Sequence, residues 1–370
     1  MRILLDYRPA LAERTGVGEY THEMAAALAG LLPERDRLTL FSSSWKDRLG
    51  IGRVPGASVV DTRVPVRLLN FAWHRLERPP VELFAGPIDI AHSSHPLLMP
   101  ARDAGRLVTI YDLFFLTDAA GTATEIRRDY PLLAGDHANR ADAVVVISEY
   151  TAAAVTTRLG VPRERLVLCP PGAPDWPRRG PWQPGGPILY LGSAERRKNV
   201  PALLRAYGRL RAQHQEAPPL ILAGRPPAAG SEVARLLEAP ELAGQVEHRG
   251  YVSEADRRRL FATAALLVVP SLDEGFGMPA LEAMTIGLPV VAANRGALPE
   301  VTGDAAWLVD PLDDGGIAEG MRQVLSDTAA TLTRIERGFT RAAAYSWRAS
   351  AARLLEAYHH VHATRRHRHA

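Results

Sequence analysis

The segment from residue 264 to residue 292 constrains the fold more than any other part of the chain. A short apolar run (264–269) is followed by a glycine-bearing loop, a helical pattern (280–286) and a second apolar run (288–292). Apolar runs of this length are typical of buried strands, and Pro279 suits the first turn of a helix. The segment therefore predicts strand, loop, helix and strand in that order. The free N–H groups at the start of such a helix suit a phosphate group.

Two glutamates flank the predicted start of this helix. Glu274 lies in the loop beside Gly275 and Gly277, and Glu282 is expected in the first helical turn. A carboxylate can accept hydrogen bonds from two neighbouring hydroxyl groups. Two carboxylates beside a phosphate-binding helix end therefore suit a nucleotide sugar, which carries a sugar on each side of its diphosphate. A simpler alternative is that Glu282 complements the helix dipole and that Glu274 is a solvated loop residue.

A second charged loop, at residues 193–199, contains Arg197 and Lys198. Arginine offers phosphate oxygens a planar fork and lysine offers a point charge, so the pair could stabilise a departing diphosphate. A solvated basic loop is the alternative. Only two of the 44 basic positions are lysines, Lys46 and Lys198, which suggests that arginine would not serve at position 198.

Strand and helix patterns alternate in both halves of the chain, which predicts an α/β class with parallel sheets. Between the halves lies a segment dense in proline and glycine (169–187) that suits a linker. Strands are expected at 3–6, 38–41, 89–92, 107–111, 141–148, 166–169, 188–192, 220–223 and 246–251, with helices at 20–31, 149–159, 200–213 and 254–264. Ligands bind beyond the carboxyl ends of such strands, which are expected to carry His92, His95, Tyr111 and Asp112.

Residues 67–78 form an amphipathic helical pattern with arginines at its edges. Its apolar face consists of Leu68, Leu69, Ala72, Trp73 and Leu76. Packing against the core is the expected role of this face because the segment is short and single. A helix that lies on a membrane surface is the alternative.

Composition limits the classes of protein that the chain can represent. Its 370 residues suffice for two ordinary domains, and no apolar run approaches the roughly 18 residues that a membrane span needs. The lone Cys169 excludes an intramolecular disulfide and suits a reducing compartment. A net charge of +3 gives no argument for nucleic-acid binding. The sequence, which begins without a signal-peptide pattern, predicts a cytoplasmic protein and leaves open a peripheral contact with the inner face of the membrane.

The run from Glu274 to Glu282, EGFGMPALE, resembles the Glu-x7-Glu signature of retaining glycosyltransferases of family 4. The continuations Gly-Leu-Pro-Val-Val and Leu-Pro-Glu-Val also fit. The resemblance implies a GT-B fold, in which two Rossmann-like, doubly wound domains face each other across a cleft. We expect an acceptor-side domain at 1–175 and a nucleotide-sugar domain at 186–345. Residues 346–370 would form a helix that crosses back to the first domain, ending in a frayed tail.

The same resemblance implies roles for individual residues. Arg197 and Lys198 would hold the diphosphate, Glu274 the hydroxyls of the transferred sugar, and Glu282 the ribose. The expected site has four further parts. They are a glycine loop (Gly16 and Gly18), a ring beside the base (Tyr251), backbone N–H groups at the helix start (Phe276, Gly277 and Met278) and an acid at a strand end (Asp112).

The expected reaction is retaining transfer of a hexosyl group from GDP-mannose or a UDP-hexose. The acceptor, which the sequence does not identify, would be a saccharide, a lipid-linked sugar or a small molecule. No cofactor or metal is expected, and the absence of any Asp-x-Asp argues against the metal-dependent single-domain transferases. Many relatives have histidine where this chain has Tyr111. Two alternatives stay open: a non-catalytic nucleotide-sugar-binding partner and a nucleotide-sugar 2-epimerase.

Overall fold

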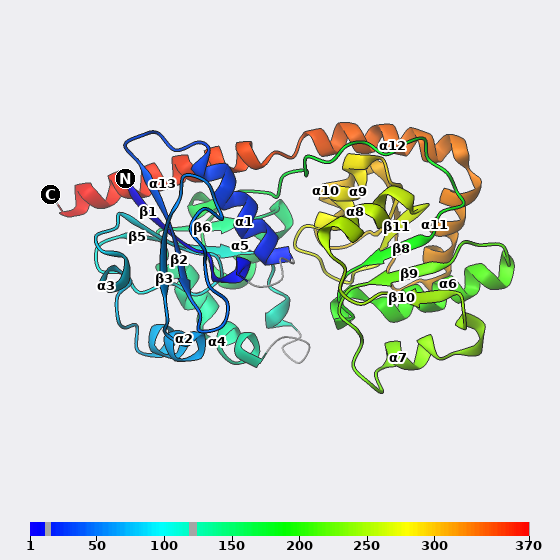
Figure 1. Cartoon of the computed structure of the whole chain (residues 1–370), viewed down its shortest axis with the longest axis horizontal. Coiled ribbons are helices and arrows are strands. Elements are labelled where there is room, and N and C mark those ends of the chain that lie inside the picture. The colour runs from blue at the N-terminus through cyan, green and yellow to red at the C-terminus, as the bar shows by residue number, and fades with distance from the viewer. Residues whose placement is uncertain (12–15, 118–123, 370) are drawn as a thin grey trace. The chain divides into compact units, whose positions relative to one another are not determined.

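The computed structural model describes residues 1–11, 16–117 and 124–369 (Figure 1). The chain divides into two compact units. The N-terminal unit consists of Met1–Gly172 together with Ser346–Ala370, and the C-terminal unit consists of Ala173–Tyr345. The first unit is therefore discontinuous in sequence. No helix in the described ranges is both long and apolar enough to cross a membrane.

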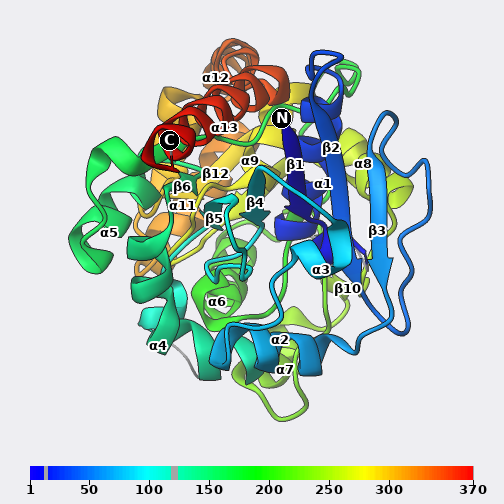
Figure 2. The same ribbon diagram turned by 90° about the vertical axis from the view of Figure 1, so that its left-hand side faces the viewer.

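The described part of the N-terminal unit contains a parallel sheet with the order β3-β2-β1-β4-β5-β6-β7, most of which can be followed in Figure 2. Its strands are short and mostly buried, as expected of apolar runs in a parallel sheet covered on both faces. They are β1 (Arg2–Asp6), β2 (Arg37–Ser43), β3 (Ser58–Thr62), β4 (Ile90–Ser93), β5 (Gly105–Ile110), β6 (Ala143–Val146) and β7 (Leu166–Leu168).

Helices pack against this sheet. They are α1 (Gly16–Ala29), α2 (Val66–Arg75), α3 (Glu82–Ala85), α4 (Thr124–Arg140), α5 (Glu149–Leu159) and α13 (Trp347–His369). Side-chain capping explains the bounds of α5: the Ser148 hydroxyl accepts a hydrogen bond from the Thr151 N–H, and Gly160 ends the helix in the left-handed region. Helix α13 packs against α1 and the strands β5–β7.

The C-terminal unit has a second parallel sheet, with the order β10-β9-β8-β11-β12-β13. The strands are β8 (Ile188–Leu191), β9 (Leu220–Ala223), β10 (Val246–His248), β11 (Leu266–Val269), β12 (Val290–Ala293) and β13 (Ala306–Val309). The helices are α6 (Val200–Gln213), α7 (Glu232–Leu237), α8 (Glu254–Thr263), α9 (Met278–Ile286), α10 (Leu298–Thr302), α11 (Asp314–Ser326) and α12 (Thr328–Ala343). Part of the proline-rich segment belongs to this unit's core, because the buried Trp182 donates its indole N–H to the Ala265 carbonyl over 2.7 Å.

Strand order reverses at one place in each sheet, between β1 and β4 and between β8 and β11. Crevices for ligands form at such reversals, beyond the carboxyl ends of the two strands. The loops that follow these four strands are therefore the places to look for functional side chains.

Three expectations were wrong. Helix α9 begins at Met278, two residues earlier than expected, so Glu282 lies in its second turn. Helix α13 continues through the arginine- and histidine-rich segment to His369 instead of fraying. The apolar pattern at 67–78 does not form one buried face: Leu69 and Trp73 are buried, whereas Leu68 and Leu76 are 63% and 61% exposed.

Candidate active site

The loops after β8 and β11 lie side by side in the C-terminal unit because these strands are neighbours in the sheet. Two hydrogen bonds join the loops: the Leu272 N–H donates to the Arg197 carbonyl over 2.7 Å, and the Asn199 amide donates to the Pro270 carbonyl over 3.1 Å. Asn199 adopts a left-handed conformation, which asparagine tolerates better than most residues. The loop that carries the basic pair is thus fixed to the loop that carries Glu274.

Lys198 and Glu274 form the closest charge pair of this site. The Lys198 Nζ donates to the Glu274 Oε2 over 2.6 Å, and the Arg197 Nη1 lies 3.9 Å from the same oxygen. Burial would raise the pKa of the Glu274 carboxyl, but the charges of Lys198 and Arg197 outweigh it and hold the pKa below its ordinary value. The carboxylate is therefore ionised at neutral pH. Both cation contacts involve Oε2, so acceptor capacity remains for hydroxyl groups.

The backbone of Glu274 is held by the segment that follows β12. The Ala297 N–H donates to the Glu274 carbonyl over 2.8 Å. A Cβ on Gly296 would lie 2.7 Å from both the N and the O of Glu274, so only glycine permits this approach. The position of the carboxylate is thus fixed by main-chain contacts as well as by its cations.

Helix α9 begins directly beyond Glu274. Gly277 is its N-cap, with a φ of 101°, and supplies no side chain to cap the helix. Within the described residues, no hydrogen bond uses the N–H groups of Phe276, Gly277 or Met278 as donors. The Phe276 ring is buried against Tyr345, with 5.3 Å between ring centroids, so its backbone alone can face a ligand. An anion-binding helix start therefore adjoins the two cations.

Glu282 lies further along α9 and is buried. The Nη2 of Arg257, in α8, lies 3.3 Å from the Glu282 Oε1, and the Arg257 guanidinium lies over the Trp176 ring at 5.1 Å. Glu282 lies in the second turn of α9, whereas the helix dipole acts mainly within the first turn, so the dipole is a weak explanation of this residue. The sequence analysis missed Arg257 because it belongs to a run of three arginines typical of an exposed helix. Trp176, over which Arg257 lies, could have been noticed in the sequence as an aromatic residue within the linker.

Tyr251 follows β10 and precedes α8. Its side chain is 50% exposed, so it does not belong to the core. The Gly224 N–H donates to the Gly250 carbonyl over 2.8 Å and thereby joins the loops after β9 and β10. An exposed ring on a fixed turn can stack on a planar ligand.

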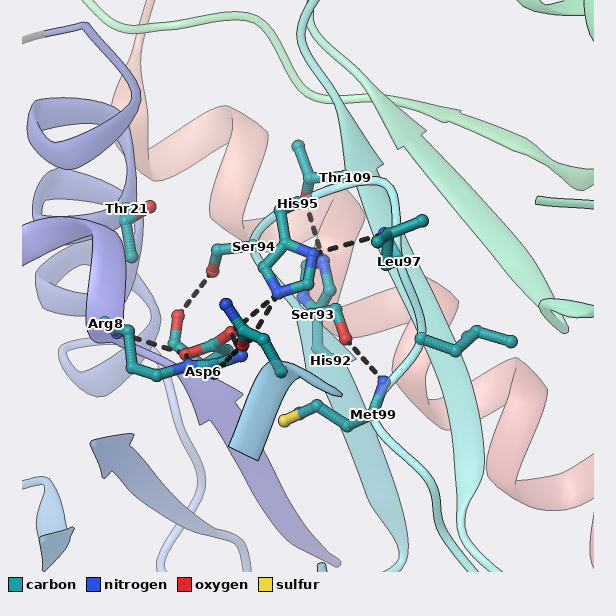
Figure 3. A network of polar contacts seen from close by, with 12 residues as sticks. Asp6, Arg8, Thr21, His92, Ser93, Ser94, His95, Leu97, Met99 and Thr109 are labelled. Atoms are coloured by element: carbon teal, nitrogen blue, oxygen red, sulfur yellow. Dashed lines mark hydrogen bonds and ion pairs between the residues drawn. The ribbon is translucent and has the colours of Figure 1, made fainter. Parts of the chain in front are cut away.

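A second polar cluster lies at the reversal point of the N-terminal sheet, beyond β1 and β4 (Figure 3). Buried Asp6 pairs with Arg8 at 2.7 Å and with His95 at 3.2 Å. Burial opposes ionisation of Asp6, but Arg8 and His95 outweigh it and lower its pKa. The Arg8 guanidinium also donates to the Asn70 side chain over 2.8 Å. Sequence analysis missed Asp6 and Arg8; an acid at the end of the first strand was the available signal.

The two histidines after β4 differ in their surroundings. His92 is buried, and its ring nitrogens lie 2.6 Å from the Tyr358 hydroxyl and 2.9 Å from the Thr109 hydroxyl. Burial lowers the pKa of His92 to about 3, so the ring is neutral and structural. His95 keeps a partly exposed edge and its contact with Asp6, which makes it the histidine that a ligand could reach.

The remaining candidates lie on the N-terminal unit. Gly16 begins α1, and Gly18 lets this helix approach the Pro9 carbonyl, which a Cβ would meet at 2.6 Å. The Asp112 carboxylate accepts a hydrogen bond from the Phe114 N–H over 3.1 Å. Burial raises the pKa of Tyr111, so this phenol cannot act as a base near neutral pH. In the described part of the chain, no three His, Cys, Asp or Glu residues are grouped to hold a metal ion.

Two family models match the chain and together cover most of it. Residues 14–175 match the model described as Glycosyltransferase Family 4, and residues 182–341 match the model described as Glycosyl transferases group 1. The O-antigen chain mannosyltransferase B of Escherichia coli is 29% identical over 97% of this chain and 99% of its own length.

Solved structures share the fold. Sucrose-phosphate synthase from Thermosynechococcus elongatus has a TM-score of 0.77 at 20% identity, with 98% of this chain and 100% of that chain covered. Anabaena HepE, solved in complex with UDP and glucose, has a TM-score of 0.72 at 18% identity, with 96% and 99% covered. These matches, with the two sheets and the motif from Glu274 to Glu282, show that the chain is a GT-B glycosyltransferase that belongs to family 4.

Proposed function

We propose that the chain transfers a hexosyl group from a nucleotide-diphosphate sugar to an acceptor, with retention of configuration at the anomeric carbon. The observation that carries this proposal is the arrangement around Glu274. Two cations, a buried ionised carboxylate and a helix start with available N–H groups adjoin one another in the C-terminal unit. Cations and helix N–H groups suit a diphosphate, and the carboxylate suits sugar hydroxyls.

Each charged side chain has a role in this proposal. Arg197 and Lys198 bind the diphosphate and stabilise the negative charge that grows on it as the glycosidic bond breaks. The N–H groups from Phe276 to Met278 assist them. Glu274 orients the transferred sugar, while its own position is fixed by Lys198 and by the backbone contact with Gly296.

The other end of the donor is bound further along α9 and α8. Glu282 accepts hydrogen bonds from the ribose hydroxyls, and Tyr251 lies beside the base. The contact between Arg257 and Glu282 supports this role, because an arginine beside the carboxylate limits its rotation.

The acceptor is assigned to the N-terminal unit, with Gly16, Gly18 and Asp112 as contacts. The acceptor hydroxyl would attack on the face from which the diphosphate leaves, and the departing phosphate would take its proton. Transfer of this kind needs neither a nucleophile from the protein nor a divalent metal. The saccharide, lipid-linked or small-molecule class of the acceptor remains to be measured.

We favour GDP-mannose over a UDP-hexose as the donor. The relative from Escherichia coli that aligns with 97% of this chain is named a mannosyltransferase. A UDP-hexose is the second candidate, because HepE has been solved with UDP and glucose.

The first experiment is a thermal-shift screen with GDP, UDP, ADP, TDP and their common sugar conjugates. A ligand that binds the folded state at a hundred times its Kd adds about 2.7 kcal/mol of stability, which gives a clear rise in melting temperature. The nucleotide that binds is then used in a transfer assay with an acceptor panel, with and without EDTA. NMR of the product gives the anomeric configuration.

Retained configuration and EDTA-resistant transfer are the expected results. An inverted product, or loss of activity in EDTA with rescue by a divalent metal, would overturn the corresponding part of the proposal. Nucleotide binding that is accompanied neither by transfer nor by slow donor hydrolysis would favour the non-catalytic partner. The reason to test this alternative is that Tyr111 replaces the histidine found in many relatives. Conversion of the donor without any acceptor would indicate an epimerase.

A further inference from the structure

In the C-terminal unit, the loop that carries Glu274 and the N–H groups of the helix start contacts helix α10. Just before this helix, the Ala297 N–H donates to the Glu274 carbonyl over 2.8 Å. The first residue of α10 also contacts the loop, because a Cβ on Gly277 would lie 2.6 Å from the Leu298 Cδ2. The positions of the carboxylate and of the N–H groups therefore depend on the position of α10.

The far end of α10 is held by side chains from α12. Helix α10 spans only five residues, and the last carbonyls of a helix have no partner within it. Arg341 donates its Nε to the Val301 carbonyl over 3.0 Å and its Nη2 to the Glu300 carbonyl. The Tyr345 hydroxyl, just beyond α12, also donates to the Glu300 carbonyl, over 3.3 Å. The Arg341 guanidinium both caps this helix end and complements its partial negative charge.

Tyr345 also contacts the loop itself. Its ring meets the buried Phe276 ring edge-on, with 5.3 Å between the centroids and 88° between the planes. The Phe276 N–H is one of the groups to which we assign the diphosphate. The side chains of Arg341 and Tyr345 thus hold the loop at two points, at Phe276 directly and at Glu274 through α10.

Helix α12 gives these side chains a fixed base. It packs along α9 and contacts α10 (Figure 1). The approach to α9 is close, since a Cβ on Gly287, the C-cap of α9, would lie 2.7 Å from the Phe339 ring. One turn of packing is completed by Gly338, where a Cβ would lie 3.4 Å from the Met284 side chain. Arg341 therefore extends from a helix that is tightly packed against the candidate site.

We propose that Arg341 is a positioning residue for the transfer reaction and that it acts through α10 on Glu274. This inference rests on the function proposed above. Without Arg341, the end of α10 is released, and the Glu274 carboxylate moves relative to the N–H groups at the start of α9. Charge stabilisation in the transition state depends on this geometry, and a displacement of 1 Å can cost about 10²-fold in rate. Arg197 and Lys198 do not depend on Arg341, so binding of the nucleotide should change little.

The test measures kcat with GDP-mannose, or with UDP-glucose where the wild type prefers it, and the Kd of GDP and UDP by calorimetry. Arg341→Ala should lower kcat about tenfold and change the nucleotide Kd by no more than about twofold. Arg341→Lys keeps the charge and a donor and should recover part of the lost kcat. Arg337→Ala is the matched control, because Arg337 lies one turn earlier in α12 and pairs with the exposed Asp304 at 3.2 Å.

A milder variant covers the case in which Arg341→Ala does not fold. Tyr345→Phe keeps the ring against Phe276 and removes only the hydrogen bond to the Glu300 carbonyl, and it should lower kcat about threefold. All rates are taken at a temperature where circular dichroism shows the variants to be folded.

The outcomes separate this inference from the proposed function. A lower melting temperature with unchanged kcat in Arg341→Ala and in Tyr345→Phe would make both residues merely stabilising and overturn the inference. Equal losses of kcat in Arg341→Ala and Arg337→Ala would also overturn it. A wild type that binds nucleotide but neither transfers nor hydrolyses the donor would overturn the proposed function, and this inference with it, before any variant is measured.

Discussion

At the scale of single residues, Lys198 is the side chain whose loss should cost the most activity. Lys198→Ala removes the ammonium closest to Glu274 and with it much of the charge stabilisation of the departing diphosphate. We expect kcat to fall by about 10²–10³-fold, with the melting temperature little changed. Steady-state kinetics of Lys198→Ala and of Lys46→Ala, which alters the chain's other, exposed lysine, measure the effect. Unchanged kinetics in Lys198→Ala would remove the assignment of Lys198 to the diphosphate.

Glu274 and Glu319 give a comparison between two ion-paired glutamates. Glu274 is buried between loops, whereas Glu319 lies on the exposed side of α11 and pairs with Arg322 of the same helix at 2.6 Å. Glu274→Ala should lower kcat/KM far more than Glu319→Ala, because only Glu274 can reach a bound sugar in the proposed site. Similar values of kcat/KM for the two variants would leave no reason to assign Glu274 to the site.

Arg257 acts in our proposal through Glu282 and is a positioning residue. Arg257→Ala should raise KM for the donor about tenfold with a smaller change in kcat, since the ribose contact is made in both ground and transition states. It should also reduce discrimination against a 2′-deoxyribose donor. Arg258→Ala is the control, because Arg258 also lies over Trp176 but pairs with Glu254 at 2.5 Å. Loss of deoxyribose discrimination in both variants would argue for general damage to α8.

At the scale of helices and strands, local signals predicted much of the structure. The expected bounds of α5, α6 and β9 agree with the observed bounds. The bounds of α5 follow from its caps, Ser148 and Gly160, and such capping depends only on residues that are close in sequence. The alternation of strands and helices that predicts two parallel sheets is likewise visible in the sequence.

Other elements depend on contacts that sequence periodicity does not contain. The outer strand β3 is only partly buried and has no strong apolar pattern. Leu68, Phe71 and Leu76 are apolar but exposed, whereas Leu69 and Trp73 are buried, so apolar character alone does not predict which side of α2 packs against the core. The end of α13 is held by a long-range ion pair, Arg365 to Asp142 at 3.0 Å. Such choices belong to tertiary packing.

His92 joins three elements, since it lies in β4 and contacts Thr109 of β5 and Tyr358 of α13. Its pKa of about 3 lies below the ordinary 6.5. As the pH falls from 6.5 toward 3, the unfolded chain takes up a proton here and the folded chain does not. The N-terminal unit should therefore lose up to about 1.4 kcal/mol per pH unit from this ring. Above pH 6.5 the ring is neutral in both states and adds no pH dependence.

Thermal unfolding of the protein between about pH 7 and pH 5 tests this linkage. His74 and His137 also have lowered pKa values, of about 3 and about 4, and act in the same direction. His92→Gln should lower the stability at neutral pH and reduce its dependence on pH, while His360→Gln, on the exposed side of α13, should leave that dependence unchanged. A slope that does not change in His92→Gln would contradict a neutral His92.

At the scale of the whole molecule, the candidate site shows what a sequence motif can predict. The motif identifies Glu274 and the basic loop identifies Lys198, but the two residues are 76 positions apart, so the sequence does not predict their 2.6 Å contact. That contact follows from strand order, because β8 and β11 are neighbours. The cluster of Asp6, Arg8 and His95 also depends on strand order, at the reversal between β1 and β4. The acid at the end of β1 is a local signal for Asp6 but does not indicate its partners.

Deletion of residues 346–370 should affect the two units unequally. Helix α13 buries Leu354, Tyr358 and Val361 in the N-terminal unit, and burial of each such side chain contributes about 1.5–3 kcal/mol. Their loss approaches the whole stability of an ordinary domain, about 5–15 kcal/mol. Calorimetry should show that the transition of the N-terminal unit is lost or strongly lowered while the transition of the C-terminal unit, raised by bound nucleotide, persists. Equal loss of both transitions would contradict this division.

The split of the N-terminal unit between Met1–Gly172 and Ser346–Ala370 has a consequence for biosynthesis. Domains ordinarily fold in the order in which the ribosome releases them. Here the first segment to emerge lacks α13 until all of the C-terminal unit has been translated. The C-terminal unit can therefore complete its core first. Until α13 is made, the N-terminal unit exposes the apolar surface that Leu354 and Tyr358 cover in the folded protein. Chaperones that protect nascent chains would therefore be needed longest by the half of the protein that is made first.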